Sequence, residues 1–356
     1  MTTAPLRIVV WGTGFVGKMV IKEILDHSRF ELVGVIVADP AKDGKDVGDI
    51  CGIDPVGITA STDADAVLMG TEPDAVAHYG PTAAEARTNI ADLGNALRRG
   101  IDVVSTAMTN FVWWPTADRW MVDPIQEACA EGGASCFTTG IDPGFANDLL
   151  PMTLMGVCGR VDSVRASEIL DYSTYTGDYS PMGFCEPPEF TALLEIPEVL
   201  VMAWGGTVPM MAEAIGVELD DITTTYDKWV ADEPIGYPHG TVEPGTVGAI
   251  RYTINGVVAG EPRIVLEHVN RITNRAAPDW PWGRIAESDV YRVDIEGSPA
   301  ISQETMLRGE GGDANAGGCL ATGLRALNAV PAVITADPGM LTALDLPLVP
   351  GVGTIR

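Results

Sequence analysis

The N-terminal segment constrains the fold of this chain more than any other part of the sequence. Leu6–Trp11 (LRIVVW) is a short, apolar run rich in β-branched residues, which predicts a buried parallel strand. It leads directly into a glycine-rich turn, after which apolar residues up to Ile24 recur at helical spacing. Glu31–Val37 then predicts a second strand. This order of strand, turn, helix and strand predicts a βαβ unit.

The turn has the G-x-G-x-x-G pattern of a dinucleotide-binding site, in the strand-to-helix context that such a site requires. We expect Gly12 to allow a tight turn, Gly14 to let the backbone approach a pyrophosphate, and Gly17 to let helix and strand pack closely. Free N–H groups and the dipole at the helix N-terminus favour the anion. The turn residues predicted to bind the cofactor are Gly12, Thr13, Gly14, Phe15, Val16 and Gly17.

The choice between NAD and NADP depends on the residues after the second strand. Asp39 stands where an acidic residue hydrogen-bonds the ribose 2′-hydroxyl of NAD, and a carboxylate there repels the 2′-phosphate of NADP. Lys42 and Lys45 follow closely and are able to hold that phosphate instead. The sequence therefore favours NAD and leaves NADP open.

Strands and helices continue to alternate after this unit, which predicts an α/β fold with a doubly wound parallel sheet. Further strands are expected at Ile58–Ser61, Asp74–His78, Asp102–Ser105 and Ser135–Thr138, and helices at Thr82–Arg99 and Asp118–Glu131. Residues 1–146 are accordingly predicted to form a Rossmann domain.

The pattern changes after Gly144, where long alternating segments follow one another and predict a mainly antiparallel sheet with one face covered. These segments are Val161–Tyr172, Thr246–Val258, Arg263–Thr273, Val290–Glu296 and Ala300–Leu307. We expect an α+β domain for substrate binding and dimerisation over residues 147–313. A helix at Ala314–Thr335, kinked or shortened by Pro331, is expected to begin a C-terminal region (314–356) that packs back on the first domain.

Composition and charge exclude several classes of function. The net charge of −27, from 49 acidic and 22 basic residues, argues against nucleic-acid binding, which needs a basic surface. No pair among the six cysteines has C-x-x-C spacing, which argues against a zinc site or a disulfide framework, so we expect no metal. The chain has no apolar run long enough for a membrane helix, and its N-terminus lacks a basic region, so we expect a cytoplasmic protein.

The ligand of an open α/β sheet lies beyond the carboxyl ends of the strands. Three segments are therefore expected to face the nicotinamide: His78–Thr82, Thr106–Asn110 and Thr139–Asn147. From these segments, His78, Thr106 and Gly140 are predicted cofactor contacts, Asn110 is a candidate catalytic residue, and Thr109, Phe145 and Asn147 are candidates for the substrate pocket. The last segment is also typical of a domain hinge.

The chain resembles the dihydrodipicolinate-reductase-like NAD(P)-dependent oxidoreductases, in the branch of 2,4-diaminopentanoate dehydrogenase and the native amine dehydrogenases. The resemblance rests on WGTGFVG at Trp11–Gly17, VVSTAMTN at Val103–Asn110, TTGIDPGFANDLLP at Thr138–Pro151 and LEHVNRI at Leu266–Ile272. It implies a Rossmann domain, an α+β domain that carries dimer contacts, and hydride transfer to or from a C=N or C=O carbon.

The chain departs from this resemblance in two places. Dihydrodipicolinate reductase carries a His-His and Lys motif in its second domain, and nothing like it occurs here. The amine dehydrogenases carry a glutamate in the loop after the fifth strand, where it handles the proton of ammonia and imine. Here that loop reads Ala107-Met108-Thr109-Asn110, without a carboxylate, which puts amine chemistry in doubt.

The remaining candidates for proton transfer lie in the second domain. The resemblance places His268 near the substrate, although a lone histidine on a strand is more often structural. Three tyrosines follow a strand, namely Tyr172, Tyr175 and Tyr179. They either line a pocket, donate a proton or only pack against neighbouring side chains. Tryptophans in proline-containing loops, among them Trp280, indicate an apolar pocket or interface packing.

These observations predict an enzyme that moves a hydride between NAD or NADP and a C=O or C=N carbon of a small, fairly apolar substrate. His268 and Tyr172, with Asn110, are the candidate catalytic residues, and Trp280 and Tyr175 are candidates for the pocket. We expect a homodimer without membrane or nucleic-acid partners. The alternative is a non-catalytic NAD(P) sensor of the same fold, against which the loop aromatics argue.

Overall fold

The computed structural model describes residues 4–81, 85–175, 179–285 and 288–355. The chain forms two compact units, of which unit 1 comprises Met1–Gly140 with Cys319–Arg356 and unit 2 comprises Ile141–Gly318. The sequence had suggested these divisions at 146/147 and 313/314. The predicted helix start at Thr82 lies outside the described residues.

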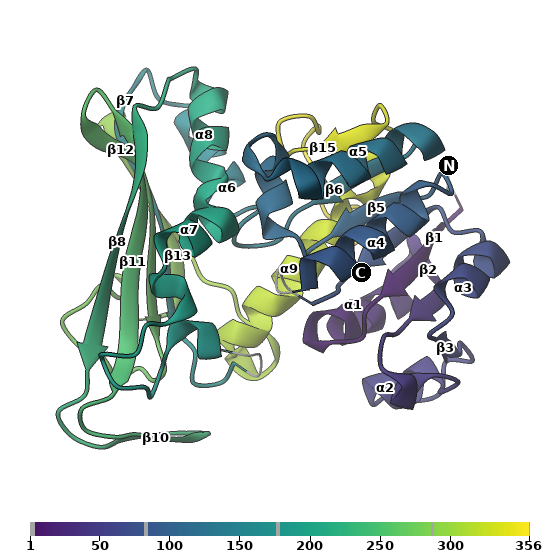
Figure 1. The fold of residues 1–356 in the computed structure, drawn as a ribbon, viewed down its shortest axis with the longest axis horizontal. Helices are drawn as coiled ribbons and strands as arrows, with labels where there is room; N and C mark the ends of the chain where they lie inside the picture. The colour runs from purple at the N-terminus through teal and green to yellow at the C-terminus, as the bar shows by residue number, and fades with distance from the viewer. Residues whose placement is uncertain (1–3, 82–84, 176–178, 286–287, 356) are drawn as a thin grey trace. The chain divides into compact units, whose positions relative to one another are not determined.

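Unit 1 contains a seven-stranded sheet in the order β15-β6-β5-β4-β1-β2-β3, and every adjacent pair of strands is parallel (Figure 1). This confirms the predicted parallel, doubly wound sheet. The strands are β1 (Leu6–Trp11), β2 (Phe30–Ile36), β3 (Ala60–Ser61), β4 (Ala75–His78), β5 (Asp102–Ser105), β6 (Ser135–Thr138) and β15 (Gly339–Leu341).

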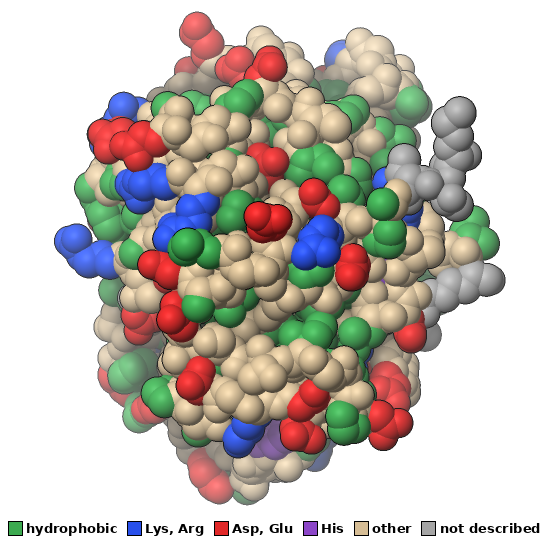
Figure 2. Space-filling model, turned by 90° about the vertical axis from the view of Figure 1, so that its right-hand side faces the viewer, with side chains coloured by type: hydrophobic (Ala, Val, Ile, Leu, Met, Phe, Trp, Pro, Cys, Tyr) green, Lys and Arg blue, Asp and Glu red, His purple; other side chains and the backbone are tan. Residues whose placement is uncertain are grey.

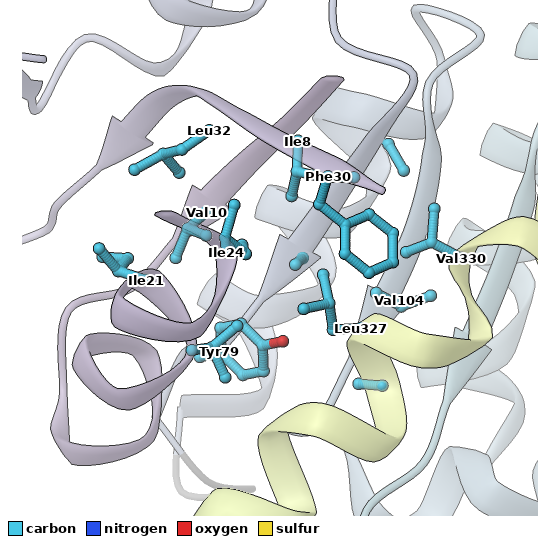
Figure 3. Close-up of a cluster of buried hydrophobic side chains, with 14 of the residues drawn as sticks. Ile8, Val10, Ile21, Ile24, Phe30, Leu32, Tyr79, Val104, Leu327 and Val330 are labelled. Carbon is cyan, nitrogen blue, oxygen red and sulfur yellow. The ribbon is translucent and has the colours of Figure 1, made fainter. Parts of the chain in front are cut away.

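Helices cover both faces of this sheet. One core joins β1 and β2 to α1, α2 and the C-terminal part of α9, and Figure 3 shows Ile24 of α1 and Val330 of α9 in it. A second core joins the other face to α3, α4 and α5. The helices are α1 (Phe15–Leu25), α2 (Val47–Cys51), α3 (Ala64–Thr71), α4 (Ala86–Leu97), α5 (Arg119–Gly132) and α9 (Ala314–Val333).

Unit 1 differs from the sequence prediction in four elements, one of which is the short helix α2, where no helix was predicted. The third strand is only two residues long, and α3, which the sequence analysis missed, begins where the Asp63 carboxylate accepts a hydrogen bond from Ala66 N at 2.9 Å. The short strand β15 pairs in parallel with β6 and adds an edge that the sequence did not predict. A strand of three residues is too short for its alternating pattern to be recognised in the sequence.

Unit 2 contains a six-stranded, mainly antiparallel sheet in the order β14-β13-β7-β12-β11-β8. The central pair β7 and β12 is parallel, and the other pairs are antiparallel. This agrees with the predicted mainly antiparallel sheet, to which the edge strand β8 is added. The strands are β7 (Arg160–Asp171), β8 (Asp221–Val230), β11 (Val247–Val258), β12 (Glu261–Arg271), β13 (Val290–Ser298) and β14 (Ile301–Thr305). A separate hairpin consists of β9 (Ile235–Tyr237) and β10 (Gly240–Val242).

Helices α6 (Leu149–Met155), α7 (Pro197–Leu200) and α8 (Thr207–Ile215) contribute to the core on one face of this sheet (Figure 1). Val208 and Met211 of α8 are fully buried there against residues of β11 and β12. None of the described helices combines the length and apolarity that crossing a bilayer requires. Figure 2 shows one face of the molecule, on which acidic, basic and apolar side chains are interspersed.

Candidate active site

The glycine turn of unit 1 has the geometry that a dinucleotide requires. Gly12 has a φ of +107°, and a Cβ there would lie 2.4 Å from the Tyr79 carbonyl oxygen. A Cβ on Gly17 would lie 2.0 Å from the carbonyl oxygen of Gly12, so only glycine lets helix and turn approach this closely. By contrast, no heavy atom lies within 4 Å of a Cβ on Gly14. The turn is therefore open at Gly14, where a pyrophosphate would approach, and closed behind it.

The N-terminus of α1 is suited to bind an anion. Gly14 caps this helix, no side chain caps its first N–H groups, and no acidic residue lies in its first turn. Phosphate oxygens would accept from these N–H groups, and the helix dipole favours their charge. The residues present therefore fit a dinucleotide cofactor, whose nicotinamide would supply hydride transfer chemistry.

Two charged side chains lie near the adenosine end expected for such a cofactor. Asp39 Oδ1 accepts a hydrogen bond from Ala41 N at 2.9 Å, which fixes the carboxylate just after β2. Lys42 Nζ donates to the carbonyl oxygen of Thr13 at 3.2 Å and to its hydroxyl at 3.1 Å. The ammonium is thus held on the glycine turn itself.

The other predicted residues of unit 1 follow the carboxyl ends of parallel strands. His78 is fully buried at the end of β4, with Nδ1 3.1 Å from Ser105 Oγ and Nε2 3.8 Å from Asp92 Oδ2. Thr106 N donates to the His78 carbonyl oxygen at 3.2 Å. The Asn110 amide is buried and lies 3.3 Å from Met121 Sδ, and Gly140 is buried just after β6. These side chains remain candidates for contact with cofactor or substrate.

Unit 2 contains a histidine between two carboxylates. His268 Nε2 lies 3.3 Å from Asp142 Oδ2, and His268 Nδ1 lies 3.5 Å from Glu168 Oε1. The side chains of Asp142 and His268 are each 2% exposed, and that of Glu168 is 8% exposed. We refer to Asp142, His268 and Glu168 as the buried array.

The pairing of strands explains how two members of the array meet. In the parallel pair β7–β12, Glu168 stands opposite His268, and the neighbouring positions Ala166 and Leu266 on the same face are buried in the unit 2 core. Side chains alternate along a strand, so Glu168 and His268 both point towards this covered face. Asp142 follows β6 along the chain and lies at the start of unit 2.

Three further side chains contact the carboxylates of the array. Asn147 Nδ2 donates to Asp142 Oδ2 at 2.8 Å, and Asn270 Nδ2 donates to Glu168 Oε1 at 2.9 Å. The Tyr172 hydroxyl donates to Glu168 Oε1 at 3.1 Å. Of the residues predicted from the sequence, His268, Tyr172 and Asn147 are therefore brought together.

Aromatic rings enclose the histidine. The Tyr252 ring is stacked on the His268 ring with centroids 4.6 Å apart and an angle of 13° between the planes. The Trp204 ring meets the same imidazole edge-on at 5.2 Å. This apolar enclosure strengthens electrostatic interactions within the array because water is kept away.

The environment shifts the three pKa values in different directions. Burial raises the pKa of Asp142 well above its usual range, against the charge of His268 and with the help of Glu168 and Asp148. Burial also acts to raise the pKa of Glu168, but hydrogen bonds and charge from His268, with Asn270 and Tyr172, lower it overall. Burial acts to lower the pKa of His268, but Asp142 and Glu168 outweigh it and raise this pKa. The array therefore favours an imidazolium beside an ionised Glu168 and a protonated Asp142.

One atom from each residue of the array lies within 4.8 Å of the others, which is close enough for a metal site. However, the two carboxylates approach opposite nitrogens of one imidazole ring. A single metal ion bound to one ring nitrogen cannot also take the place of the carboxylate contact at the other ring nitrogen. The geometry therefore favours charge pairing of the imidazole with both carboxylates, of which the contact of Nε2 with Asp142 lacks hydrogen-bond geometry.

The predicted pocket residues do not all lie with His268. Trp280 packs against Ile169 and Val269, which alternate along their strands with Glu168 and His268, so Trp280 lies on the opposite face of the sheet. Tyr175 packs edge-on against Tyr172 with centroids 5.3 Å apart. Phe145 and Thr109 are half-buried, the latter at the start of the turn that follows β5.

Four residues of the site were not predicted from the sequence: Asp142, Glu168, Asn270 and Tyr252. A usable signal existed for two of them, because Glu168 and Asn270 occupy positions on the apolar, inward face of alternating strands. A charged or amide side chain at such a position is rarely buried without a partner. For Asp142, the turn sequence gave no indication of its burial.

Comparison with known proteins gives matches over nearly the whole chain. The model of the 2,4-diaminopentanoate dehydrogenase C-terminal domain matches residues 145–354, and that of the dihydrodipicolinate reductase N-terminus matches residues 6–98. An amine dehydrogenase of Streptomyces virginiae is 39% identical over 355 residues, covering 98% of both chains. A 2,4-diaminopentanoate dehydrogenase of Acetoanaerobium sticklandii is 25% identical, covering 96% of this chain and 94% of that one. The solved amine dehydrogenase of Mycobacterium smegmatis shares the fold, with a TM-score of 0.77, 21% identity and 98% of each chain covered.

Proposed function

The chain belongs to the 2,4-diaminopentanoate dehydrogenase family, and we propose that it is an NAD(P)-dependent enzyme that oxidises a primary amine of a small, fairly apolar molecule, or forms that amine in reverse. The similarity to an amine dehydrogenase over nearly the whole chain supports a catalyst rather than a non-catalytic NAD(P) sensor. The absence of a glutamate from Ala107–Asn110 requires another group to handle the proton of the nitrogen.

One observation carries this proposal: a buried imidazole lies between two carboxylates of different pKa. Groups whose environments push their pKa values apart are typical of acid–base sites. In the proposed reaction, Asp142 and His268 exchange a proton with the substrate nitrogen. Glu168, held by Asn270 and Tyr172, keeps the imidazole oriented and charged.

Coupled assays test the proposed reaction. We expect reduction of NAD(P)⁺ with short primary alkylamines, and oxidation of NAD(P)H with the corresponding ketones only when ammonium is present. His268→Gln should lower kcat by about 10²–10⁴-fold, the usual contribution of a positioned acid or base, with unchanged NADH affinity. Ketone reduction that is independent of ammonium, together with no turnover of amines, would overturn the proposal in favour of carbonyl chemistry.

We further propose that NAD is the preferred cofactor. The Asp39 carboxylate disfavours a 2′-phosphate, and Lys42 is already engaged with Thr13. Comparing kcat/KM for NAD and NADP in the wild type, Asp39→Ser and Lys42→Ala tests this preference. If the wild type prefers NADP and Lys42→Ala removes that preference, the lysine rather than the aspartate decides the cofactor.

We also propose that the protein is a homodimer in the cytosol. The sheet face opposite the α8 core carries a polar network in which Arg251 and Arg165 contact the buried Glu267 at 2.6 and 3.3 Å. An ordered polar network on a sheet face is compatible with pairing of two copies. Light scattering at micromolar concentration should give the mass of a dimer, and the mass of a monomer would refute it.

A further inference from the structure

The buried array and the two asparagines that contact it contain more hydrogen-bond acceptors than donors. Asn147 and Asn270 each donate through Nδ2 to a carboxylate of the array, which leaves their own oxygens pointing elsewhere. Within the described part of the chain, Asn147 Oδ1, Asn270 Oδ1, Asp142 Oδ1 and His268 Nε2 have no hydrogen-bond partner. Both asparagines are fully buried, and the Asp142 side chain is 2% exposed.

Unsatisfied acceptors at this depth are costly. Each buried polar atom without a partner costs about 1–3 kcal/mol, and native proteins retain such atoms rarely. Three of the four unpaired atoms are oxygens, and the fourth, His268 Nε2, lies 3.3 Å from Asp142 Oδ2 without hydrogen-bond geometry. Because most of these atoms are oxygens, the pattern favours a ligand with N–H donors over an anion.

The charge of the array indicates the same kind of ligand. An imidazolium and two ionised carboxylates would carry a net charge of −1, and the array limits this charge by keeping Asp142 protonated. The other titratable groups that act on these residues are acidic or phenolic: Asp148, Tyr172, Tyr252 and Glu267. With Asp142 ionised, the carboxylates around a bound cation would outnumber the single imidazolium of His268, so the cation would meet a net negative charge.

We propose that Asp142, Asn147 and Asn270 form a subsite that binds the nitrogen of the amine substrate as its ammonium or iminium cation. An ammonium supplies N–H donors of the kind that these oxygens lack, and its charge allows Asp142 to release its proton to solvent on binding. This subsite would replace the loop carboxylate that the chain lacks. The inference rests on the proposed function, because it assumes that the substrate carries such a nitrogen.

Calorimetry on the full chain saturated with NADH tests the subsite without turnover, because amine and NADH are both reduced. The probes are unbranched primary alkylamines of three to eight carbons and the alcohols of the same carbon skeletons. We expect the wild type to bind at least one amine about 10-fold or more tightly than its alcohol, about what one lost charged hydrogen bond would cost. Repeating the titration in buffers of different ionisation enthalpy should reveal release of a proton.

Asp142→Asn is nearly isosteric and removes the charge, so it should abolish both the preference for amines and the proton release while leaving alcohol binding unchanged. The exposed Asp162→Asn, at the start of β7, is the matched control and should behave as the wild type. Equal binding of amines and alcohols by the wild type, binding of neither, or an unchanged amine preference in folded Asp142→Asn would overturn the inference.

The same amines in the NAD(P)⁺ reduction assay separate this inference from the proposed function. Turnover of amines without selective binding at Asp142 would remove the subsite but leave the function. Selective, proton-linked binding of amines without any turnover would leave the subsite and remove the function.

Discussion

The imidazole of His268 is stacked on the ring of Tyr252, with centroids 4.6 Å apart and planes inclined by 13°. The two residues are direct partners in the antiparallel pair β11–β12, so the pairing of strands fixes the contact. Because Asp142 and Glu168 favour the charged imidazole, the electron-rich face of the tyrosine adds to the stabilisation of that charge.

Tyr252→Leu should therefore lower the pKa of His268. A cation–π contact contributes about 0.5–2 kcal/mol, which corresponds to a decrease of up to about 1.5 pKa units. Tyr252→Phe keeps the aromatic face and should leave the pKa nearly unchanged. An NMR titration of the imidazole in the three proteins measures this difference, and equal pKa values in the Leu and Phe variants would show that the stacking is only steric.

The glycine turn allows binding of the cofactor to be separated from folding. A side chain at Gly14 meets no heavy atom within 4 Å, so Gly14→Val should keep the native circular dichroism and melting temperature but block the approach of the pyrophosphate. We expect its affinity for NADH, followed by fluorescence, to fall by at least about 10-fold, about the loss of one charged hydrogen bond.

Gly17→Ala is the contrasting variant, because its Cβ would lie 2.0 Å from the Gly12 carbonyl oxygen. Overpacking of this kind typically costs about 1–3 kcal/mol of stability. Unchanged NADH affinity in Gly14→Val would refute the site. Unchanged stability in Gly17→Ala would refute the close packing of turn and helix.

A glutamate can be introduced into the loop after β5 at only one of two neighbouring positions. Met108 is fully buried in the second core of unit 1, with Sδ 3.7 Å from Asn89 Nδ2, whereas Thr109 is half-buried. Met108→Glu should lower the free energy of unfolding by about 3 kcal/mol or more, because an unpaired carboxylate would be buried, and Thr109→Glu should fold normally.

The activity of Thr109→Glu bears on the buried array. If the array already handles the proton of the nitrogen, this variant should gain little in the rate of reductive amination. A gain approaching the 10²–10⁴-fold typical of a positioned general base would show that the array does not perform this role.

Asp289 should make the stability depend on pH. Burial raises its pKa to about 6, against a hydrogen bond from Asp171 N and the charges of Arg308 and Arg271. The folded state then binds the proton more tightly than the unfolded state, so this contribution is complete below about pH 4 and is lost as the pH rises through about 6.

Asp289→Asn should thus gain stability relative to the wild type between pH 4 and pH 7, by up to about 3 kcal/mol for a shift of about two units. Urea denaturation at several pH values measures the difference, with Asp162→Asn as the exposed control. A constant difference between wild type and Asp289→Asn over this range would contradict the raised pKa.

The sequence determined those features that depend on neighbouring residues. The glycine turn lies between β1 and α1, where the roles of Gly12 and Gly17 follow from the spacing of the glycines and the strand-to-helix context. Strands with a strong apolar or alternating pattern, such as Asp102–Ser105, were located to the residue. The edge strand β8 was missed because its alternate residues are exposed and polar, a pattern shared with irregular surface segments.

Only the tertiary structure decided which chemical groups meet. His268 was a lone histidine in the sequence, and its carboxylate partners Asp142 and Glu168 lie far from it along the chain. Their proximity depends on the parallel pairing of β7 with β12 and on the path of the segment after β6, neither of which local periodicity encodes. The pKa values of these groups follow from burial and from one another's charge, and both of these exist only once the chain is folded.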